Sequence, residues 1–295
     1  MEVIGIDIGG TKILGGIIDI NGHLIKDKKI PAQAKLGKEV ILKNLFSVID
    51  ELIDKNIKGI GIGSAGRVNF DKGIVEYATD NLVGWTGCEL KKILEQRYEV
   101  PVVVDNDVNA AAIGEMWIGA GKGYKNILMI AIGTGVGGAI IYNGDLIRGS
   151  KWSAGEIGHM ILYPDGRQCN CGRKGCLEQY ISGRAIYMEY NQLLGEEKVS
   201  NAKEVFELYK ENDSKAIKVV TNFIKHLSLS ILSLKNVIDP EIFIIGGGVI
   251  DSKNLWWDKL RKVLGNDVNV VSSELGSKSS MFGSAKLIID FLDLT

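Results

Sequence analysis

The sequence has few cysteines, few prolines and almost no net charge. It holds 4 cysteines and 4 prolines among 295 residues, and its formal net charge is −1. The near-neutral balance argues against a broad basic surface for nucleic acid or for an anionic membrane. Scarce cysteine points to a reducing, cytoplasmic location. The 37 glycines beside so few prolines indicate tight turns and ligand-hugging loops rather than disordered linkers.

Long apolar runs and a secretory signal are also missing. No apolar run approaches the length of a membrane span, and "MEVIGIDIGG" starts as a strand without the two regions of a signal peptide. We therefore expect neither a membrane nor nucleic acid among the partners. The hydrophobic content of 45% is ordinary for a soluble globular protein, and the length allows one large domain or two medium ones.

The order of apolar segments predicts an α/β protein. Residues 3–8, 13–20 and 23–30 are apolar stretches separated by glycine-rich or Asn-Gly turns, which is typical of an antiparallel meander. A helical period over 38–55, a buried strand over 57–63, a helix near 89–98, a strand after Pro101 and a helix from about 108 to 119 follow. This βαβ rhythm predicts that the sheet continues with parallel strands.

The pattern then begins again. Residues 126–144 echo residues 3–23, and the two stretches end in Asn143-Gly144 and Asn21-Gly22. Helices near 183–194, 201–210 and 214–236, a buried strand in "EIFIIGGGVI" and a last helix at about 282–294 complete the chain. The self-similarity predicts two related α/β lobes with a cleft between them.

Two glycine turns follow predicted strands. "DIGGTK" at 7–12 and "IGTGVGG" at 132–138 each pair glycines with a threonine, and Lys12 adds a cation. Each alone could be a simple hairpin turn, but two of them favour phosphate binding by backbone N–H groups. Neither matches a P-loop, and neither opens a helix as a dinucleotide-binding motif does.

Two carboxylates lie at the end of the buried strand in "PVVVDND". Asp105 and Asp107 lie at its carboxyl end, where open α/β sheets place ligand groups. Asn106 or Asp107 could simply cap the following helix. Equally, a carboxylate at a strand end can accept the proton of a hydroxyl that attacks a phosphate.

Three cysteines lie within eight positions. A disulfide framework would leave one of Cys169, Cys171 and Cys176 unpaired, whereas these thiolates with His159 form a Cys₃His set suited to Zn²⁺. Incidental reduced thiols are the alternative. Four protein ligands leave no open position, so the zinc would be structural. Cys88 is isolated and is expected to be an ordinary buried thiol.

Five motifs occur in an order that resembles the ROK family (repressors, open reading frames and sugar kinases). They are "DIGGTK", "GIGSAGRV", "DNDVNAAAIGE", "IGTGVGGAII" and "GEIGH…CNCGRKGCLEQYISG". The resemblance implies the two-lobed, actin-like (ribonuclease H-like) ATPase fold. It implies a small lobe at 1–118, a large lobe at 119–281, and a C-terminal helix at 282–295 that packs back on the first lobe.

The resemblance also implies the residues that bind ATP and Mg²⁺. The first phosphate loop would comprise Gly9, Gly10, Thr11 and Lys12, the second Thr134 and Gly135, and the adenosine loop Gly246, Gly247 and Gly248. Asp7 would lie near Mg²⁺ and hold it through water.

The sugar site follows from the same resemblance. Asp107 would be the base, and the sugar would contact Gly66, Asn81, Asn106, Asp107, Glu156, His159 and Glu178. Without the resemblance, both glutamates would be taken for solvated surface acids. The chain departs from the family at Asp105, where glutamate is commoner, and at Asp80 and Val83, where proline is common. We treat Asp105 as a supporting residue.

These features predict an ATP-dependent hexose 6-kinase, with glucose as the default substrate. N-acetylmannosamine, N-acetylglucosamine, mannose and fructose are the alternatives, and a homodimer or homotetramer is expected. A ROK transcriptional repressor is a second hypothesis, disfavoured because the first phosphate strand begins at residue 3. A non-catalytic sugar sensor is a third, opposed by Asp107 and both phosphate turns.

Overall fold

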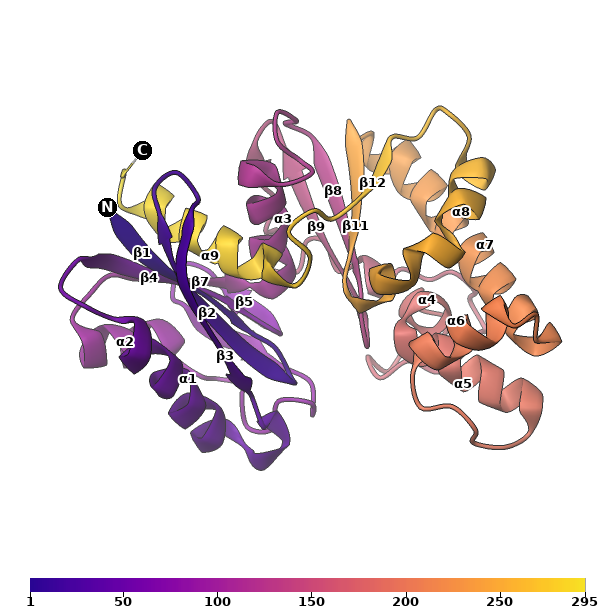
Figure 1. Ribbon diagram of the computed structural model, residues 1–295, viewed down its shortest axis with the longest axis horizontal. Helices are drawn as coiled ribbons and strands as arrows, with labels where there is room; N and C mark the ends of the chain where they lie inside the picture. Colours follow the sequence, from indigo (N-terminus) through magenta and orange to yellow (C-terminus); the bar gives the residue numbers. More distant parts are fainter. Residues whose placement is uncertain (295) are drawn as a thin grey trace. The chain divides into compact units, whose positions relative to one another are not determined.

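The protein is a mixed α/β chain with two five-stranded sheets (Figure 1). The computed structural model describes residues 1–294, and residue 295, the predicted end of the C-terminal segment, lies outside them. The strands are β1 Glu2–Ile8, β2 Lys12–Asp19, β3 Leu24–Pro31, β4 Ile57–Ser64, β5 Arg67–Asn69, β6 Ile74–Tyr77, β7 Val102–Asn106, β8 Ile127–Ile132, β9 Val136–Tyr142, β10 Asp145–Leu146, β11 Ile242–Gly246 and β12 Val270–Ser272. The α-helices are α1 Lys38–Leu52, α2 Leu90–Tyr98, α3 Asp107–Ile118, α4 Glu178–Ile181, α5 Gly183–Leu194, α6 Ala202–Lys210, α7 Ser214–Ile238, α8 Trp257–Leu264 and α9 Ser279–Phe291.

The first sheet has the order β3-β2-β1-β4-β7. Its β1, β2 and β3 form the predicted antiparallel meander, and β4 and β7 continue it in parallel, also as predicted. Both faces are covered, so β1 and β4 are almost continuously buried. Helices α1 and α2 pack on one face, and α3 and α9 on the other (Figure 1).

Helix α9 lies unusually close to this sheet because glycines line its path. A Cβ on Gly61 would lie 1.7 Å from the carbonyl oxygen of Ser284, so no other residue fits there. The helix begins at Ser279 and ends at Phe291, a few residues before the predicted 282–294. It packs against β1 and β4, which explains why the C-terminal segment belongs with the N-terminal sheet.

The second sheet repeats this topology. Its order is β10-β9-β8-β11-β12, with an antiparallel β8–β9 hairpin followed by the parallel strands β11 and β12. Helices α4 to α8 share one core with its strands. Each sheet therefore places a hairpin turn and the carboxyl ends of parallel strands at one edge, where open sheets bind ligands.

The chain divides into two compact units that differ from the predicted lobes. One comprises Met1–Gly123, Asp145–Ala154 and the stretch from Ser273 onward, and the other Tyr124–Gly144 and Gly155–Ser272. Residues 145–154 and 273–281 were expected in the second lobe. They join the first because Arg148 pairs with the buried Asp105, and Ser273 donates to the buried Glu115. The β5–β6 hairpin, α4, α8 and β12 were not predicted.

Helix α7 is long and apolar enough to cross a membrane by length and composition, contrary to the expectation that no such run exists. Among the described residues it is the single helix of this kind. Over half of its most apolar window, 56%, is buried inside the protein. Residues such as Phe223, Leu227 and Ile231 on this helix are core residues of the second unit, which accounts for its hydropathy.

Candidate functional site

The first glycine turn joins β1 to β2 and places a buried acid beside a lysine. Asp7 is only 9% exposed, and the Nζ of Lys12 lies 4.0 Å from its Oδ2. Burial raises the pKa of the Asp7 carboxyl, while the Lys12 charge and the Ser280 hydroxyl oppose that rise. Gly10 and Thr11 at the tip of the turn are exposed. A buried acid that its neighbours compensate only in part, next to an exposed glycine turn, suits a site that receives a cation with a phosphate.

The acidic turn lies at the carboxyl end of β7, where α3 begins. Asn106 is the helix cap: its Oδ1 accepts from the backbone N–H groups of Val108 and Asn109 at 2.8 and 3.1 Å. Its Nδ2 donates to the Gly66 carbonyl at 2.9 Å, which brings two predicted sugar residues together. Asn106 is therefore the helix cap, and Asp107 is the half-buried first residue of α3, where its Oδ1 accepts from the Val108 N–H at 3.0 Å.

Asp105 is buried and neutralised. It is 1% exposed and forms an ion pair at 2.8 Å with Arg148. A carboxylate so enclosed is held by donors of the protein itself, and its supporting role stays a prediction. Asp107, two residues further along, is half-buried, and its role as the base stays a prediction.

The four predicted zinc ligands converge. One ligand atom from each of His159, Cys169, Cys171 and Cys176 lies within 4.8 Å of the others. The Sγ atoms of Cys171 and Cys176 are 3.5 Å apart, and the Cys169 Sγ is 3.7 Å from the His159 Nδ1. Bonds of about 2.0–2.3 Å in a tetrahedron separate ligands by about 3.3–3.8 Å, so this donor set fits Zn²⁺.

The loop that carries these ligands depends on a close backbone approach. Gly175 has φ 76°, and a Cβ on it would lie 1.6 Å from the carbonyl oxygen of Tyr163. Only glycine meets both conditions, and it delivers Cys176 to the cluster. All four cysteines are free thiols, and Cys88 is the buried one expected, with burial raising its pKa to about 11.

The two glutamates near the cluster have different surroundings. Glu156 is exposed, and its Oε2 lies 4.0 Å from the Nε2 of His159, the ring nitrogen turned away from Cys169. Glu178 instead accepts a hydrogen bond from the Val136 N–H at 3.0 Å, beside the second glycine turn. The surface-acid alternative therefore fails for Glu178, whose carboxylate is tied to the backbone of β9.

The second glycine turn and the predicted adenosine loop belong to the second unit. Thr134 is exposed, and the Gly133 N–H bonds the Gly135 carbonyl at 2.9 Å to close the turn. The N–H of Gly183, which opens α5, donates to the Gly133 carbonyl at 2.8 Å. Gly246 ends β11, and exposed Gly247 and Gly248 follow it. The structure thus presents glycine backbone at the ends of both β8 and β11.

Asn81 lies in a loop in which exposed residues alternate with the buried Leu82 and Trp85. The loop is anchored by Trp85, whose Nε1 donates to the Ser64 Oγ at 3.0 Å, and the Val83 N–H bonds the Ala34 carbonyl. Asn81 itself is exposed. Its predicted contact with a sugar stays a prediction.

Comparison with known proteins identifies the family. A model of the ROK family matches residues 3–290. The chain belongs to the ROK family. Its mixed α/β fold with two five-stranded sheets is the two-lobed, actin-like fold of that family.

Several relatives of this ROK protein carry names. It is 37% identical to a glucokinase of Halalkalibacterium halodurans (83% of this chain, 80% of the relative) and 34% identical to a glucokinase of Streptomyces coelicolor (96% of each). It is also 29% identical to the xylose repressor of Bacillus subtilis, over 99% of this chain and 78% of the repressor. A crystal structure of a ROK family glucokinase from Streptomyces griseus, in complex with glucose and AMPPNP, matches with a TM-score of 0.84 and 34% identity (97% of this chain, 99% of that one).

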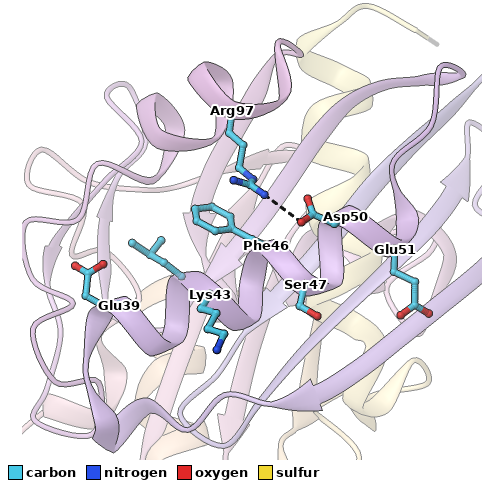
Figure 2. Close-up of a pocket in the computed structure, with 8 residues that line it drawn as sticks. Glu39, Lys43, Phe46, Ser47, Asp50, Glu51 and Arg97 are labelled. Atoms are coloured by element: carbon cyan, nitrogen blue, oxygen red, sulfur yellow. Dashed lines mark hydrogen bonds and ion pairs between the residues drawn. The ribbon is translucent and has the colours of Figure 1, made fainter.

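A hollow on this ROK protein lies along α1 (Figure 2). It is lined by Glu39, Leu42, Lys43, Phe46, Ser47, Asp50, Glu51 and Arg97. The Arg97 guanidinium bonds Asp50 at 3.1 Å and lies 4.5 Å from the Phe46 ring centre. Arg97 thus has partners within the hollow, and none of the predicted site residues is among the residues that line it.

Sequence reasoning missed two residues that support the site. No sequence motif marks Arg148, because its partner Asp105 is 43 positions away in the chain. Glu115 ends the motif "DNDVNAAAIGE" but was assigned no role. It is fully buried and accepts from the Ala120 N–H, the Leu275 N–H and the Ser279 hydroxyl at 2.9, 3.0 and 2.7 Å. Its place at the end of that motif was the one available signal.

Proposed function

We propose that this ROK protein is an ATP-dependent hexose kinase that phosphorylates the 6-hydroxyl of glucose. The observation that supports the proposal is that three neighbouring polar residues at the carboxyl end of β7 have different surroundings. Asn106 caps the helix, Asp105 is paired with Arg148 and buried, and Asp107 is a half-buried carboxylate at the helix start that accepts from the Val108 N–H. The named glucokinase relatives, and the glucose and ATP analogue bound to the Streptomyces griseus protein, support the choice of reaction.

In the proposed reaction, Asp107 accepts the proton of the sugar 6-hydroxyl as that oxygen attacks the γ-phosphorus. The new O–P bond forms while the bond to the β-phosphate oxygen breaks, which gives a sugar 6-phosphate and ADP. The turns at Gly9–Gly10 and Thr134–Gly135 would stabilise phosphate charge through backbone N–H groups other than that of Gly9, which bonds the Lys12 carbonyl at 3.0 Å, and Lys12 adds a cation. Asp7 would hold Mg²⁺ through water, and the ion supplies charge neutralisation on the phosphates.

The zinc ligands serve this reaction indirectly. His159, Cys169, Cys171 and Cys176 would hold Zn²⁺, which supplies a cross-link of the loop and no chemistry. His159 would keep its Nε2 for the sugar, beside Glu156. Glu156 and Glu178 would accept hydrogen bonds from other sugar hydroxyls. The adenosine would lie against Gly246, Gly247 and Gly248.

Glucose is preferred over an N-acetylated sugar because the predicted partners are polar. Asn81, Asn106, Asp107, Glu156, His159 and Glu178 suit a polyhydroxylated pyranose, and no apolar niche for an acetyl methyl group is assigned. A partner left unpaired costs about 1–3 kcal/mol, so a sugar that lacks one hydroxyl should lose roughly tenfold or more in kcat/KM. A putative N-acetylmannosamine kinase of Listeria monocytogenes has the same fold (TM-score 0.88, 26% identity) and represents the main alternative.

The test is kcat/KM for glucose, mannose, fructose, N-acetylglucosamine and N-acetylmannosamine, with ATP and Mg²⁺ held constant. We expect glucose to lead. An N-acetylated sugar that leads by tenfold would refute the glucose assignment and keep the kinase. No turnover with any sugar would refute the kinase, and the similarity to the xylose repressor would then favour a sugar-binding regulator, tested by sugar binding without ATP. Assembly as a homodimer or homotetramer stays a prediction for sedimentation analysis.

A further inference from the structure

The buried carboxylate of Asp105 is fully occupied by donors. Its Oδ2 accepts from the Nε and Nη2 of Arg148, both at 2.8 Å. Its Oδ1 accepts from the Asn106 N–H at 2.7 Å and from the Asn109 Nδ2 at 2.9 Å. Two of these four donors belong to the turn and helix that carry Asp107. The orientation of that turn therefore depends on where the Asp105 carboxylate is held.

Arg148 holds that carboxylate from a different part of the chain. It follows β10 and lies in the segment Asp145–Ala154, which enters the first unit from the second and returns to it. Its guanidinium carbon lies 3.7 Å from the centre of the Phe70 ring, and the side chain is 20% exposed. The planar guanidinium of Arg148 is thus stacked on the Phe70 ring and bonded to Asp105 through two nitrogens, which leaves the side chain little conformational freedom.

The backbone of Arg148 also closes the loop that follows it. Its carbonyl accepts from the Ala154 N–H at 3.1 Å, and the Trp152 N–H bonds the Gly149 carbonyl. Trp152 is held at φ 58°, a left-handed conformation that is rare for a bulky residue and that tends to cluster at functional sites. This loop runs directly into Gly155 and Glu156, so its anchor lies eight residues before a predicted sugar ligand.

A second bond joins the same segments. The Nη1 of Arg67 lies 3.4 Å from the Ser153 hydroxyl, and the neighbouring Gly66 carbonyl accepts from Asn106. Three stretches, at residues 66–67, 105–106 and 148–153, are therefore linked by side-chain bonds. Among these links, the pair formed by Arg148 and Asp105 is the buried, charged one.

We propose that Arg148 is a positioning residue for phosphoryl transfer, acting through Asp105. The inference rests on the proposed kinase function and deepens it. By neutralising and orienting Asp105, Arg148 fixes the turn in which Asn106 and Asp107 lie, and leaves Asp107 as the base. At the same time it anchors the Gly149–Ala154 loop, whose residues belong to the same unit.

The variants Arg148→Met, Arg148→Lys and the double variant Asp105→Asn/Arg148→Met test this role. We expect Arg148→Met to lower kcat about 10²-fold, the size expected when a reacting group is misplaced by about 1 Å. The KM for ATP should change less than about twofold, because Gly9–Lys12 makes no contact with Arg148. Arg148→Lys keeps the charge but not the fork, so an intermediate loss of about tenfold is expected.

The double variant separates positioning from stability. It removes both charges, so no unpaired buried ion is left and the melting temperature should recover relative to Arg148→Met. We expect kcat to stay low. Lys151→Met, which removes an exposed cation from the same loop, is the matched control and should keep wild-type kcat.

Two results would overturn the inference. One is an Arg148→Met protein with kcat within threefold of wild type. The other is a double variant that recovers kcat together with its melting temperature, which is the behaviour of a purely structural pair. Assays of the wild-type protein on the same sugars distinguish a failure of the positioning role of Arg148 from a failure of the proposed kinase function. An active wild type with an unaffected Arg148→Met variant overturns only the positioning role, whereas an inactive wild type overturns both.

Discussion

The Glu178 carboxylate accepts a hydrogen bond from the backbone N–H of Val136 at 3.0 Å. Glu178 lies two residues after the zinc ligand Cys176, and Val136 follows the glycine turn that contains Thr134 and Gly135. A predicted sugar ligand is thereby joined to the predicted phosphate turn. Order in the cysteine loop should consequently affect ATP as well as sugar.

Because of that bond, we predict that two substitutions of Glu178 differ in their effect on the KM for ATP. Glu178→Ala removes the acceptor, so it should raise the KM for both ATP and sugar, by a factor of about 5 to 150 for a lost buried partner. Glu178→Gln keeps an acceptor oxygen for Val136 and should leave the KM for ATP near wild type while the KM for sugar rises. Steady-state kinetics with each substrate varied in turn checks this. An unchanged KM for ATP in Glu178→Ala would contradict the link.

Asp107→Asn should keep the fold and sugar binding but lose the base. We expect kcat to fall roughly 10²–10⁴-fold, the usual contribution of general-base assistance. Turnover with glucose and ATP, together with sugar affinity by calorimetry, provides the measurement. Near wild-type turnover would rule out Asp107 as the base.

The metal cluster should bind about one zinc ion per chain. Cys171→Ser should lose that zinc and bind sugar poorly, because His159, Glu156 and Glu178 would lose their common support. Cys88→Ser changes a buried thiol outside the cluster and is the matched control, with zinc content expected to stay unchanged. Elemental analysis of metal-replete protein is the assay, and equal zinc in Cys171→Ser and wild type would count against the cluster.

Asp7→Asn should separate activity from stability. Because burial raises the pKa of Asp7, the folded protein binds this proton more tightly than the unfolded chain does. Ionised Asp7 therefore destabilises the fold, and this effect appears as the pH rises from about 4, the pKa of an unfolded aspartate, through the raised folded value. Asp7→Asn should be as stable as wild type at pH 4 and more stable at pH 7, yet about 10²-fold or more less active.

Urea unfolding at both pH values measures the difference for Asp7→Asn. Asp71→Asn, which changes an exposed aspartate of the same unit, is the control and should show no such pH-dependent gain. A lower stability of Asp7→Asn at pH 7 would show that the carboxylate is held by favourable contacts, contrary to this account.

The sequence by itself determined many of the helices and strands, and it indicated the metal cluster. Apolar runs broken by Asn-Gly turns predicted the β1–β2–β3 meander, because strand and turn preferences are local. The zinc set was readable because three of its four ligands lie within eight positions, so the chain has little freedom to separate them. The acidic turn was readable as well, since a strand followed by a capped helix fixes where Asn106 and Asp107 lie.

Only the tertiary structure decided which distant groups support those residues. Arg148 meets Asp105 across 43 positions, Val136 meets Glu178 across 42, and Leu275 meets Glu115 across 160. Each acid could have been a surface residue, a cap or a base by its local pattern. Burial decided among these roles, because a carboxylate taken out of water must find donors, and donors that arrive from remote segments leave no periodicity or spacing in the sequence.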